Sequence, residues 1–173
     1  MSNMKKYLVT AVTLGVIAMA SGLLIGLTNM VTRDQIAQNE INNINKGIGE
    51  IFGKEASIKE QEAVKDYQYV SERYVVEENN AVSGYAFKTV GSNSYGKVSL
   101  IIGFASNDYA FKGLYIITNE QTYASTLVEN YIDPLNEGNR EVADVSCGAT
   151  YGAKLVRDMI NEAKEAAENY KGA

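Results

Sequence analysis

Asp144-Val145-Ser146-Cys147-Gly148-Ala149-Thr150 is the stretch of this chain that best predicts how its C-terminal part folds. It is followed by apolar residues at helical spacing, namely Leu155, Val156, Met159, Ile160, Ala163, Ala166, Ala167 and Tyr170. The free N–H groups and the positive dipole end of such a helix would point at Gly148 to Thr150. Because Gly148 and Ala149 carry almost no side chain, a phosphate could approach the backbone there, with the Thr150 hydroxyl beside it.

A plainer interpretation of these residues remains open. Thr150 is an acceptable helix N-cap and Gly148 suits an ordinary turn. A short Gly-Ala-Thr string also arises by chance, so the spacing alone leaves a phosphate site as one of two possibilities.

The stretch resembles the flavinylation motif of the FMN-binding domain family, Asp-x-x-Ser/Thr-Gly-Ala-Thr. The best-known members are the RnfG-type component of the Rnf complex and the related component of the sodium-pumping NADH:quinone reductase. In that family a flavin transferase joins the phosphate of FMN to the final threonine as a phosphoester. The resemblance therefore implies covalent FMN on Thr150 and recognition of Asp144 by the transferase. The segment that it implies around the cofactor is Asp144, Ser146, Cys147, Gly148, Ala149 and Thr150.

One position departs from the family pattern. Cys147 stands where the family has Ser or Thr, and a thiol is a poorer hydrogen-bond donor than a hydroxyl. A reactive thiol near a helix N-terminus is one interpretation of Cys147, and a small residue in a tight loop is the interpretation that we favour.

The N-terminal part predicts a membrane anchor. Residues 7–31 carry no charge, and 25 helical residues reach about 37 Å, enough to cross a hydrocarbon core of about 30 Å. A cleaved signal peptide is the alternative, because Ala18-Met19-Ala20 resembles a cleavage site, but the uncharged run continues beyond it. Lys5 and Lys6 precede the span, so we expect residues 1–6 in the cytoplasm and the rest outside the cell membrane.

Charge and composition exclude several functions for the outer part. Two of the 16 basic residues and none of the 21 acidic residues lie in the first 31 positions, which leaves a net charge of −7 on the rest. This acidic balance argues against nucleic acid as a partner. A chain with one cysteine and no histidine cannot build a usual zinc site, and it offers no histidine as a general base.

The remaining pattern predicts an α+β fold. Isoleucines and a phenylalanine at steps of three and four predict an amphipathic helix over residues 41–52, and the charged residues 57–68 suggest a solvated connection. Alternating segments then predict an antiparallel meander, with an Asn79-Asn80 turn. We expect strands up to that turn and at 82–90, 97–105 and 109–118, with a loop at 91–96. The predicted organisation is a span at 7–31, a juxtamembrane helix and connection at 32–66, and an FMN-binding domain at 67–173.

The family resemblance extends over nearly the whole chain. Gly84-Tyr85-Ala86, Tyr95-Gly96, Gly103 and Gly113 follow the order that the family shows around its central hairpin. Family members then carry Glu-Thr-Pro-Gly-Leu-Gly, a loop that helps to enclose the flavin. This chain instead has Glu-Gln-Thr-Tyr-Ala-Ser from position 120, so only Glu120 and Thr122 correspond to the family loop. Three tyrosines are candidates for stacking on the flavin ring, namely Tyr95, Tyr123 and Tyr151.

The resemblance implies an electron-transfer subunit of an Rnf-like, ion-translocating membrane complex. Its partners would be the other membrane subunits and the flavin transferase that attaches FMN. Two further functions stay open, a stand-alone flavinylated carrier for an extracellular acceptor and an assembly subunit without flavin.

Overall fold

The computed structural model describes residues 3–170, apart from the side chains of residues 3, 4, 30, 31, 33, 34 and 37. The first element is the helix α1, Asn3–Phe52. The chain divides into two compact units, residues 1–41 and residues 42–173. The last turns of α1 therefore belong to the second unit.

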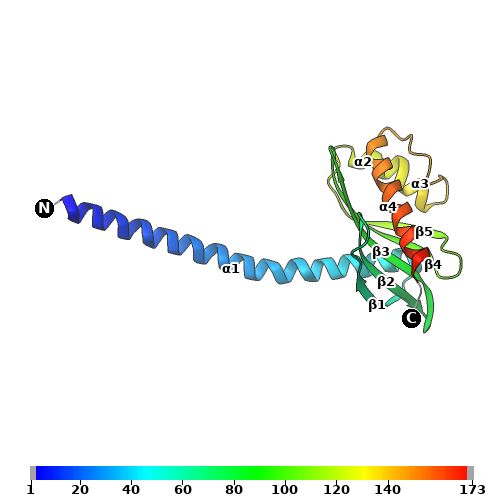
Figure 1. Cartoon of the computed structure of the whole chain (residues 1–173), viewed down its shortest axis with the longest axis horizontal. Coiled ribbons are helices and arrows are strands. Elements are labelled where there is room, and N and C mark those ends of the chain that lie inside the picture. Colours follow the sequence, from blue (N-terminus) through cyan, green and yellow to red (C-terminus); the bar gives the residue numbers. More distant parts are fainter. Residues whose placement is uncertain (1–2, 171–173) are drawn as a thin grey trace. The chain divides into compact units, whose positions relative to one another are not determined.

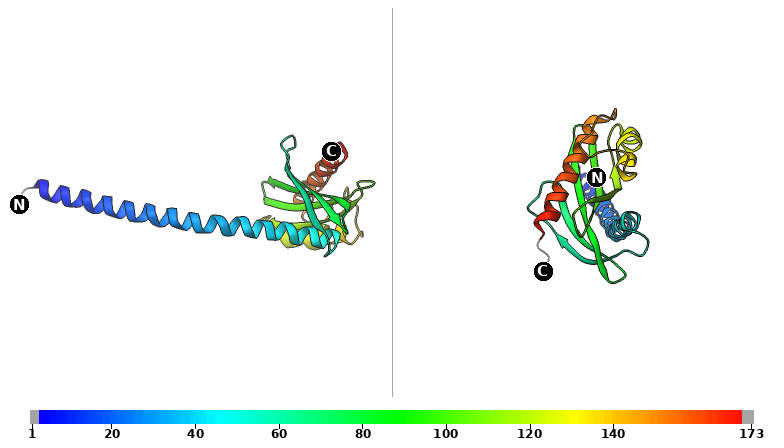
Figure 2. Two further views of the ribbon diagram at one scale, coloured as in Figure 1. Left: turned by 90° about the horizontal axis from the view of Figure 1, so that it is seen from below. Right: turned by 90° about the vertical axis from the view of Figure 1, so that its right-hand side faces the viewer.

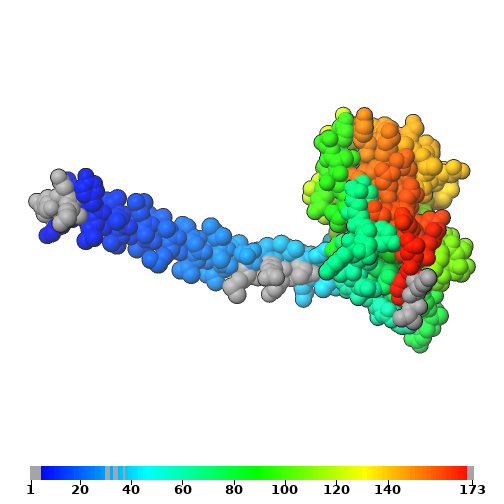
Figure 3. All heavy atoms as spheres, viewed as in Figure 1, coloured from blue at the N-terminus to red at the C-terminus, as the bar shows by residue number. Residues whose placement is uncertain are grey.

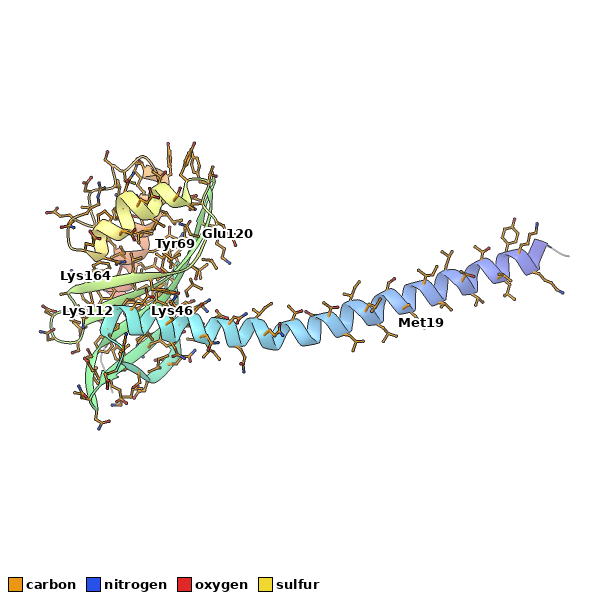
Figure 4. The ribbon with its side chains drawn as sticks, turned by 180° about the vertical axis from the view of Figure 1, so that it is seen from behind. Met19, Lys46, Tyr69, Lys112, Glu120 and Lys164 are labelled. Carbon is orange, nitrogen blue, oxygen red and sulfur yellow. The ribbon has the colours of Figure 1, made fainter. Side chains whose placement is uncertain are left out.

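The N-terminal unit carries one candidate membrane span. Lys5–Asn29 is long enough to cross a bilayer and has a mean hydropathy of 2.3. Its apolar side chains are exposed along the helix, with Met19 at 69 % (Figure 4). The hydroxyls of Thr10, Thr13 and Thr28 donate to the carbonyl oxygens four residues earlier at 2.8–3.0 Å, which satisfies them without water. These features support a single-pass anchor, two residues N-terminal to the span expected from the sequence.

The second unit is built on one five-stranded antiparallel sheet (Figure 1). The strands follow one another in chain order as a meander, β1-β2-β3-β4-β5. Their bounds are β1 Ser57–Ala63, β2 Val70–Glu78, β3 Ala81–Asn93, β4 Gly96–Ala105 and β5 Phe111–Asn119. With helices before and after the sheet, the predicted α+β class is confirmed.

The turns show where the sequence interpretation was right and where it failed. Asn79 and Asn80 have φ of 52° and 63°, so both central residues of the predicted tight turn adopt the left-handed conformation that asparagine tolerates. The expected loop at 91–96 is wrong, because β3 and β4 continue toward each other and leave only Ser94 and Tyr95 between them.

Residues 57–63 are the second correction. We expected a solvated connection over 57–68, but Ser57–Ala63 form β1, which pairs with β2 from Ser57–Glu77 to Ala63–Glu72. All residues of β1 except Ile58 are exposed. Because the strand lies at the edge of the sheet and buries almost nothing, its sequence shows no apolar alternation.

One face of the sheet is covered by the end of α1. Ile44, Ile48 and Phe52 pack there against a second set of buried residues, namely Tyr74, Val76, Ala86 and Ile101. The apolar spacing of residues 41–52 correctly predicted this amphipathic helix, although Ile41 itself is 57 % exposed. Figure 2 shows the end of α1 and the C-terminal helix on opposite faces of the sheet.

The other face carries the larger core. The C-terminal helix α4, Thr150–Asn169, buries the predicted stripe of apolar residues from Leu155 to Ala167, whereas Tyr170 lies beyond the helix and is half-buried. Its outward surface is in view in Figure 3, coloured orange to red. A helical segment that the sequence analysis did not assign packs beside it. This segment consists of α2 Ala124–Leu127, the π-helical turn η1 Val128–Ile132 and α3 Asp133–Asn136.

Close backbone approach fixes the packing of α1 on the sheet. A Cβ atom at Gly47 would lie 2.7 Å from Cδ1 of Tyr115, which no real side chain tolerates without movement. Gly49, two residues later in the same helix, has nothing within 4 Å of its Cβ position. Gly47 therefore serves the packing, whereas Gly49 does not.

These two glycines give a matched prediction. Gly49→Ala should raise the free energy of unfolding by about 1 kcal/mol, because alanine is the better helix former. Gly47→Ala gains the same propensity but forces Tyr115 aside, and such overpacking costs about 1–3 kcal/mol, so the variant should be the less stable of the two. Urea unfolding of the detergent-solubilised chain, followed by tyrosine fluorescence, measures both. Equal stabilisation by the two substitutions would contradict the contact with Tyr115.

Candidate functional site

The site begins at the N-terminus of α4. Thr150 is the first residue of the helix, and Ala149 occupies the N-cap position, with no side-chain hydrogen bond to cap the turn. The plainer interpretation of Thr150 as the N-cap is therefore wrong. Among the residues that the structure describes, the five consecutive N–H groups from Gly148 to Gly152 have no hydrogen-bond partner. Such a row of free donors at a positive helix end suits an anion.

Gly148 is required by the backbone. Its φ of +83° lies in the left-handed region, and a Cβ atom would stand 3.3 Å from Cγ2 of Thr126. The residue is exposed, so the absent side chain also leaves the backbone of the loop open to solvent. The sequence suggested the open backbone from the Gly148-Ala149 pair, but it did not predict the left-handed φ of Gly148.

A cavity of about 260 Å³ lies beside Thr150. It is lined by residues from three segments far apart in the sequence, namely Tyr95, Gln121, Tyr123, Leu127, Gly148, Ala149, Thr150, Tyr151 and Gly152. All three tyrosines that the sequence singled out are among them. No ionisable carboxyl or amino group lines the cavity.

The tyrosines form an aromatic cluster at this cavity. The rings of Tyr95 and Tyr151 stack with centroids 5.1 Å apart and an interplanar angle of 19°. Tyr123 lies 6.3 Å from Tyr95 at a tilt of 45°. The exposed fractions are 36 % for Tyr95, 54 % for Tyr123 and 62 % for Tyr151. Tyr95 and Tyr151 cover one face of each other, so a planar ligand could contact only their remaining exposed surface and that of Tyr123.

Two amide side chains hold the three segments together. Asn93 Nδ2 donates to the carbonyl oxygen of Tyr151 at 3.1 Å, which links the β3–β4 turn to α4. Gln121 Nε2 donates to the carbonyl oxygen of Gly96 at 2.5 Å and to Asn93 Oδ1 at 3.2 Å. Gln121 is only 7 % exposed, so this connection is internal.

The loop before Thr150 is held by Arg140 and Tyr131. Arg140 Nη1 donates to the carbonyl oxygens of Asp144 at 2.9 Å and Ser146 at 3.4 Å, and it lies 3.6 Å from Asp144 Oδ2. The phenol of Tyr131 donates to the carbonyl oxygen of Val142 at 2.6 Å. Burial raises the pKa of Tyr131 to about 12, so the phenol stays protonated and keeps donating at physiological pH.

The other residues suggested by the sequence lie outside the cavity lining. Asp144 and Ser146 are exposed in the loop, and Asp144 Oδ1 accepts the Ser146 N–H at 3.3 Å. Cys147 is 8 % exposed and packs in the core, which agrees with a small loop residue better than with a reactive thiol. Glu120 is exposed just after β5 (Figure 4), and the Thr122 hydroxyl donates to the carbonyl oxygen of Tyr95 at 3.1 Å.

Sequence reasoning missed several contributors. Gln121 and Asn93 gave no signal, because their roles depend on contacts across 28 residues. Lys154 could have been found, since it lies four residues after Thr150 and therefore on the same helix face, one turn away. Its Nζ stands 5.8 Å from the Tyr151 ring centroid. No group of three or more metal-binding side chains occurs among the described residues.

Comparison with known proteins adds one match. Residues 1–51 match the family described as "RnfG N-terminal region", which covers the candidate span and all of α1 except its last residue. The chain thus resembles the RnfG-type component of the Rnf complex, as its C-terminal motif independently suggested, and the match implies a subunit of an Rnf-type complex. No curated protein matches the chain.

The loop contacts of Arg140 give a second prediction. Arg140→Ala should free residues 141–147, because hydrogen bonds from a charged donor with 19 % exposure contribute about 1.5–3 kcal/mol. Amide hydrogen exchange in this segment should accelerate roughly tenfold or more. Arg157→Ala is the matched control, since Arg157 pairs with its neighbour Asp158 on α4. Unchanged exchange in the Arg140 variant would show that the loop is ordered without it.

Proposed function

We propose that this chain is the electron-transfer subunit of a membrane-bound, ion-translocating Rnf-type complex and carries FMN joined through its phosphate to Thr150. The match of residues 1–51 supports membership of such a complex. The Asp144 to Thr150 motif, which lies outside the matched region, independently supports the cofactor. Two separate parts of the chain thus favour the same family.

The observation that carries the proposal is the state of Thr150. Its hydroxyl makes no hydrogen bond with any residue that the structure describes, and it stands at the start of a 20-residue helix. The neighbouring free N–H groups could donate hydrogen bonds to the negative phosphate oxygens. Lys154, one turn later, adds a positive side chain on the same face. A phosphate on Thr150 would therefore be favourably placed, whereas the unmodified hydroxyl contributes no hydrogen bond to the fold.

The cavity fits the rest of the group. An isoalloxazine ring is planar and aromatic, and the exposed side chains of Tyr95, Tyr123 and Tyr151 offer it aromatic contacts. Because no ionised side chain lines the cavity, binding the ring would not remove a charged group from water. We assign these residues to holding the ring and Thr150 to anchoring the phosphate.

Attachment requires an activated donor. Condensing free FMN with a hydroxyl would release water and is unfavourable, so a flavin dinucleotide is the appropriate class of donor. Thr150 Oγ1 would form the new bond to the FMN phosphorus, the bond from that phosphorus to the bridging oxygen would break, and AMP would leave with that oxygen. The hydroxyl proton would pass to a base of the transferase, since no histidine exists in this chain.

The protein's own contribution is to bind and orient. When bound, FMN supplies the electron-transfer chemistry, and the chain supplies attachment, stacking and the electrostatic surroundings. Covalent attachment suits a domain outside the cytoplasm, where a dissociated cofactor would be lost.

Thr150→Ala tests the attachment. The variant should carry no FMN when it is produced together with a flavin transferase, because the acceptor oxygen is gone. Its free energy of unfolding should stay within about 0.5 kcal/mol, because the hydroxyl makes no hydrogen bond and alanine is a better helix former. Intact mass, peptide mass spectrometry and urea unfolding measure these results.

Ser146→Ala is the matched control, because it removes an exposed hydroxyl from the same loop and should leave the modification intact. An unmodified Thr150 in the wild type, or FMN on Ser146, would refute the assignment. The assembly subunit without flavin would then be the better interpretation. Modification without co-purifying membrane subunits would instead favour the stand-alone carrier.

Topology gives a further prediction. Lys5 and Lys6 precede the candidate span, and positive residues near a span stay on the cytoplasmic side. Protease added to intact cells, or to spheroplasts where an outer membrane is present, should therefore digest residues 42–173. Protection of these residues until the membrane is lysed would reverse the orientation.

A further inference from the structure

Gln121 is a buried polar side chain at the candidate cavity. It is 7 % exposed, and its Nε2 group makes two hydrogen bonds, to the carbonyl oxygen of Gly96 and to Asn93 Oδ1. A backbone carbonyl can only accept a hydrogen bond, so the amide nitrogen of Gln121 must face Gly96. The orientation of the Gln121 amide follows from this partner.

Asn93 fixes the orientation from the other side. Its Nδ2 donates to the carbonyl oxygen of Tyr151, and its Oδ1 accepts the Tyr95 N–H at 2.8 Å. Because one partner can only accept and the other can only donate, the Asn93 amide cannot be turned over without losing both bonds. Its Oδ1 therefore remains the acceptor for Gln121 Nε2.

Gln121 Oε1 is left without a partner. No hydrogen bond to this atom occurs among residues 3–170, and no fully enclosed side-chain polar atom in that range lacks a partner. The atom is therefore reachable from the cavity that Gln121 lines. A Cβ atom on Gly152 would lie 3.3 Å from it, so the missing side chain of Gly152 keeps this approach open.

We propose that Gln121 Oε1 is a fixed hydrogen-bond acceptor for the imide N–H of the ring bound in this cavity. The inference rests on the proposed function, since it takes the ring to be isoalloxazine. The oxidised ring has a single N–H group, the imide, and its other polar ring atoms are acceptors. An amide locked with its oxygen toward the cavity therefore recognises that one edge of the ring. Gln121 is a positioning residue that determines how the ring lies in the cavity.

This role predicts the direction in which the pKa of the flavin imide is shifted. A hydrogen bond from the imide N–H stabilises its protonated form, and the lone pairs of Oε1 repel the deprotonated form. The pKa of the imide should therefore be higher in the protein than in free FMN. A carboxylate at position 121 would raise it further, because it still accepts and also repels the anion. A thioether would lower it, because it is a weak acceptor.

The experiment compares the flavinylated full chain with Gln121→Glu and Gln121→Met, all produced with a flavin transferase and solubilised in detergent. Absorbance titration of the flavin through alkaline pH should place the imide pKa of the wild type above that of free FMN. Gln121→Met should lower it by about 0.5–1 unit and Gln121→Glu should raise it. Both variants lose the two Nε2 hydrogen bonds. Because a carboxylate repels the imide anion even without a hydrogen bond, the lowered pKa in Gln121→Met is the result that tests the acceptor role.

A second measurement avoids high pH. The imide proton should give a protected NMR signal at neutral pH in the wild type and in Gln121→Glu, and it should exchange rapidly with solvent in Gln121→Met. An imide pKa equal to that of free FMN, or shifts of the same direction in both variants, would overturn the acceptor role while leaving FMN on Thr150 intact. Loss of FMN from both variants would make Gln121 a structural residue and would also overturn it. A wild type without FMN by intact mass would overturn the proposed function and this inference together.

Discussion

The packing of α4 on β3 is the constraint on which the candidate site depends. The helix buries Leu155 and Met159 against the sheet, and a Cβ atom at Gly91 would lie 2.9 Å from each of these side chains. The absence of a side chain at Gly91 lets the helix lie this close to the strand. Because a helix is rigid, that contact also fixes where its first residue stands. Thr150 therefore lies beside the turn that carries Tyr95, although the two are 55 residues apart. This packing brings Thr150 and Tyr95 to one cavity, which the proposed attachment and stacking both require.

The polar links at the cavity serve a different purpose from the apolar core. Leu127 and the stripe on α4 determine that the helices cover the sheet, but apolar packing is not directional. The hydrogen bonds of Asn93 and Gln121 are directional, and they connect the β3–β4 turn, the segment before α2 and the start of α4. The core thus brings three segments together, and the two amides set their register and decide which polar atom faces the cavity. Loss of such links leaves a stable fold with a poorly defined site.

Most of the fold and part of the site could be predicted from the sequence, for physical reasons. α4 has one buried face and therefore carries a 3.6-residue apolar period. β4 is buried on both faces and instead reads as a nearly continuous apolar run, which also marks a strand. β1 could not be predicted, because an exposed edge strand needs no apolar alternation. The helical segment 124–136 could not be predicted either, because its π-helical turn breaks the 3.6-residue period and a proline stands at position 134. At the site, Thr150 could be predicted from a local motif, and the three tyrosines could be predicted as candidates from their residue type. Gln121 could not be predicted, because its role exists only through contacts with distant segments.

A small, partly open cavity explains why covalent attachment suits the proposed cofactor. The volume of about 260 Å³ is below the roughly 300–1,000 Å³ typical of pockets that enclose a small ligand, and the three tyrosines remain exposed. Stacking on such an open surface would hold an untethered ligand only weakly. The proposed phosphoester at Thr150 would make ring binding intramolecular, with an effective concentration on the order of millimolar for a short flexible tether. Weak stacking and one directional hydrogen bond are then sufficient to orient the ring. Under the proposed function, the same openness would leave the ring accessible to neighbouring redox groups, so an open cavity and a covalent anchor would complement each other.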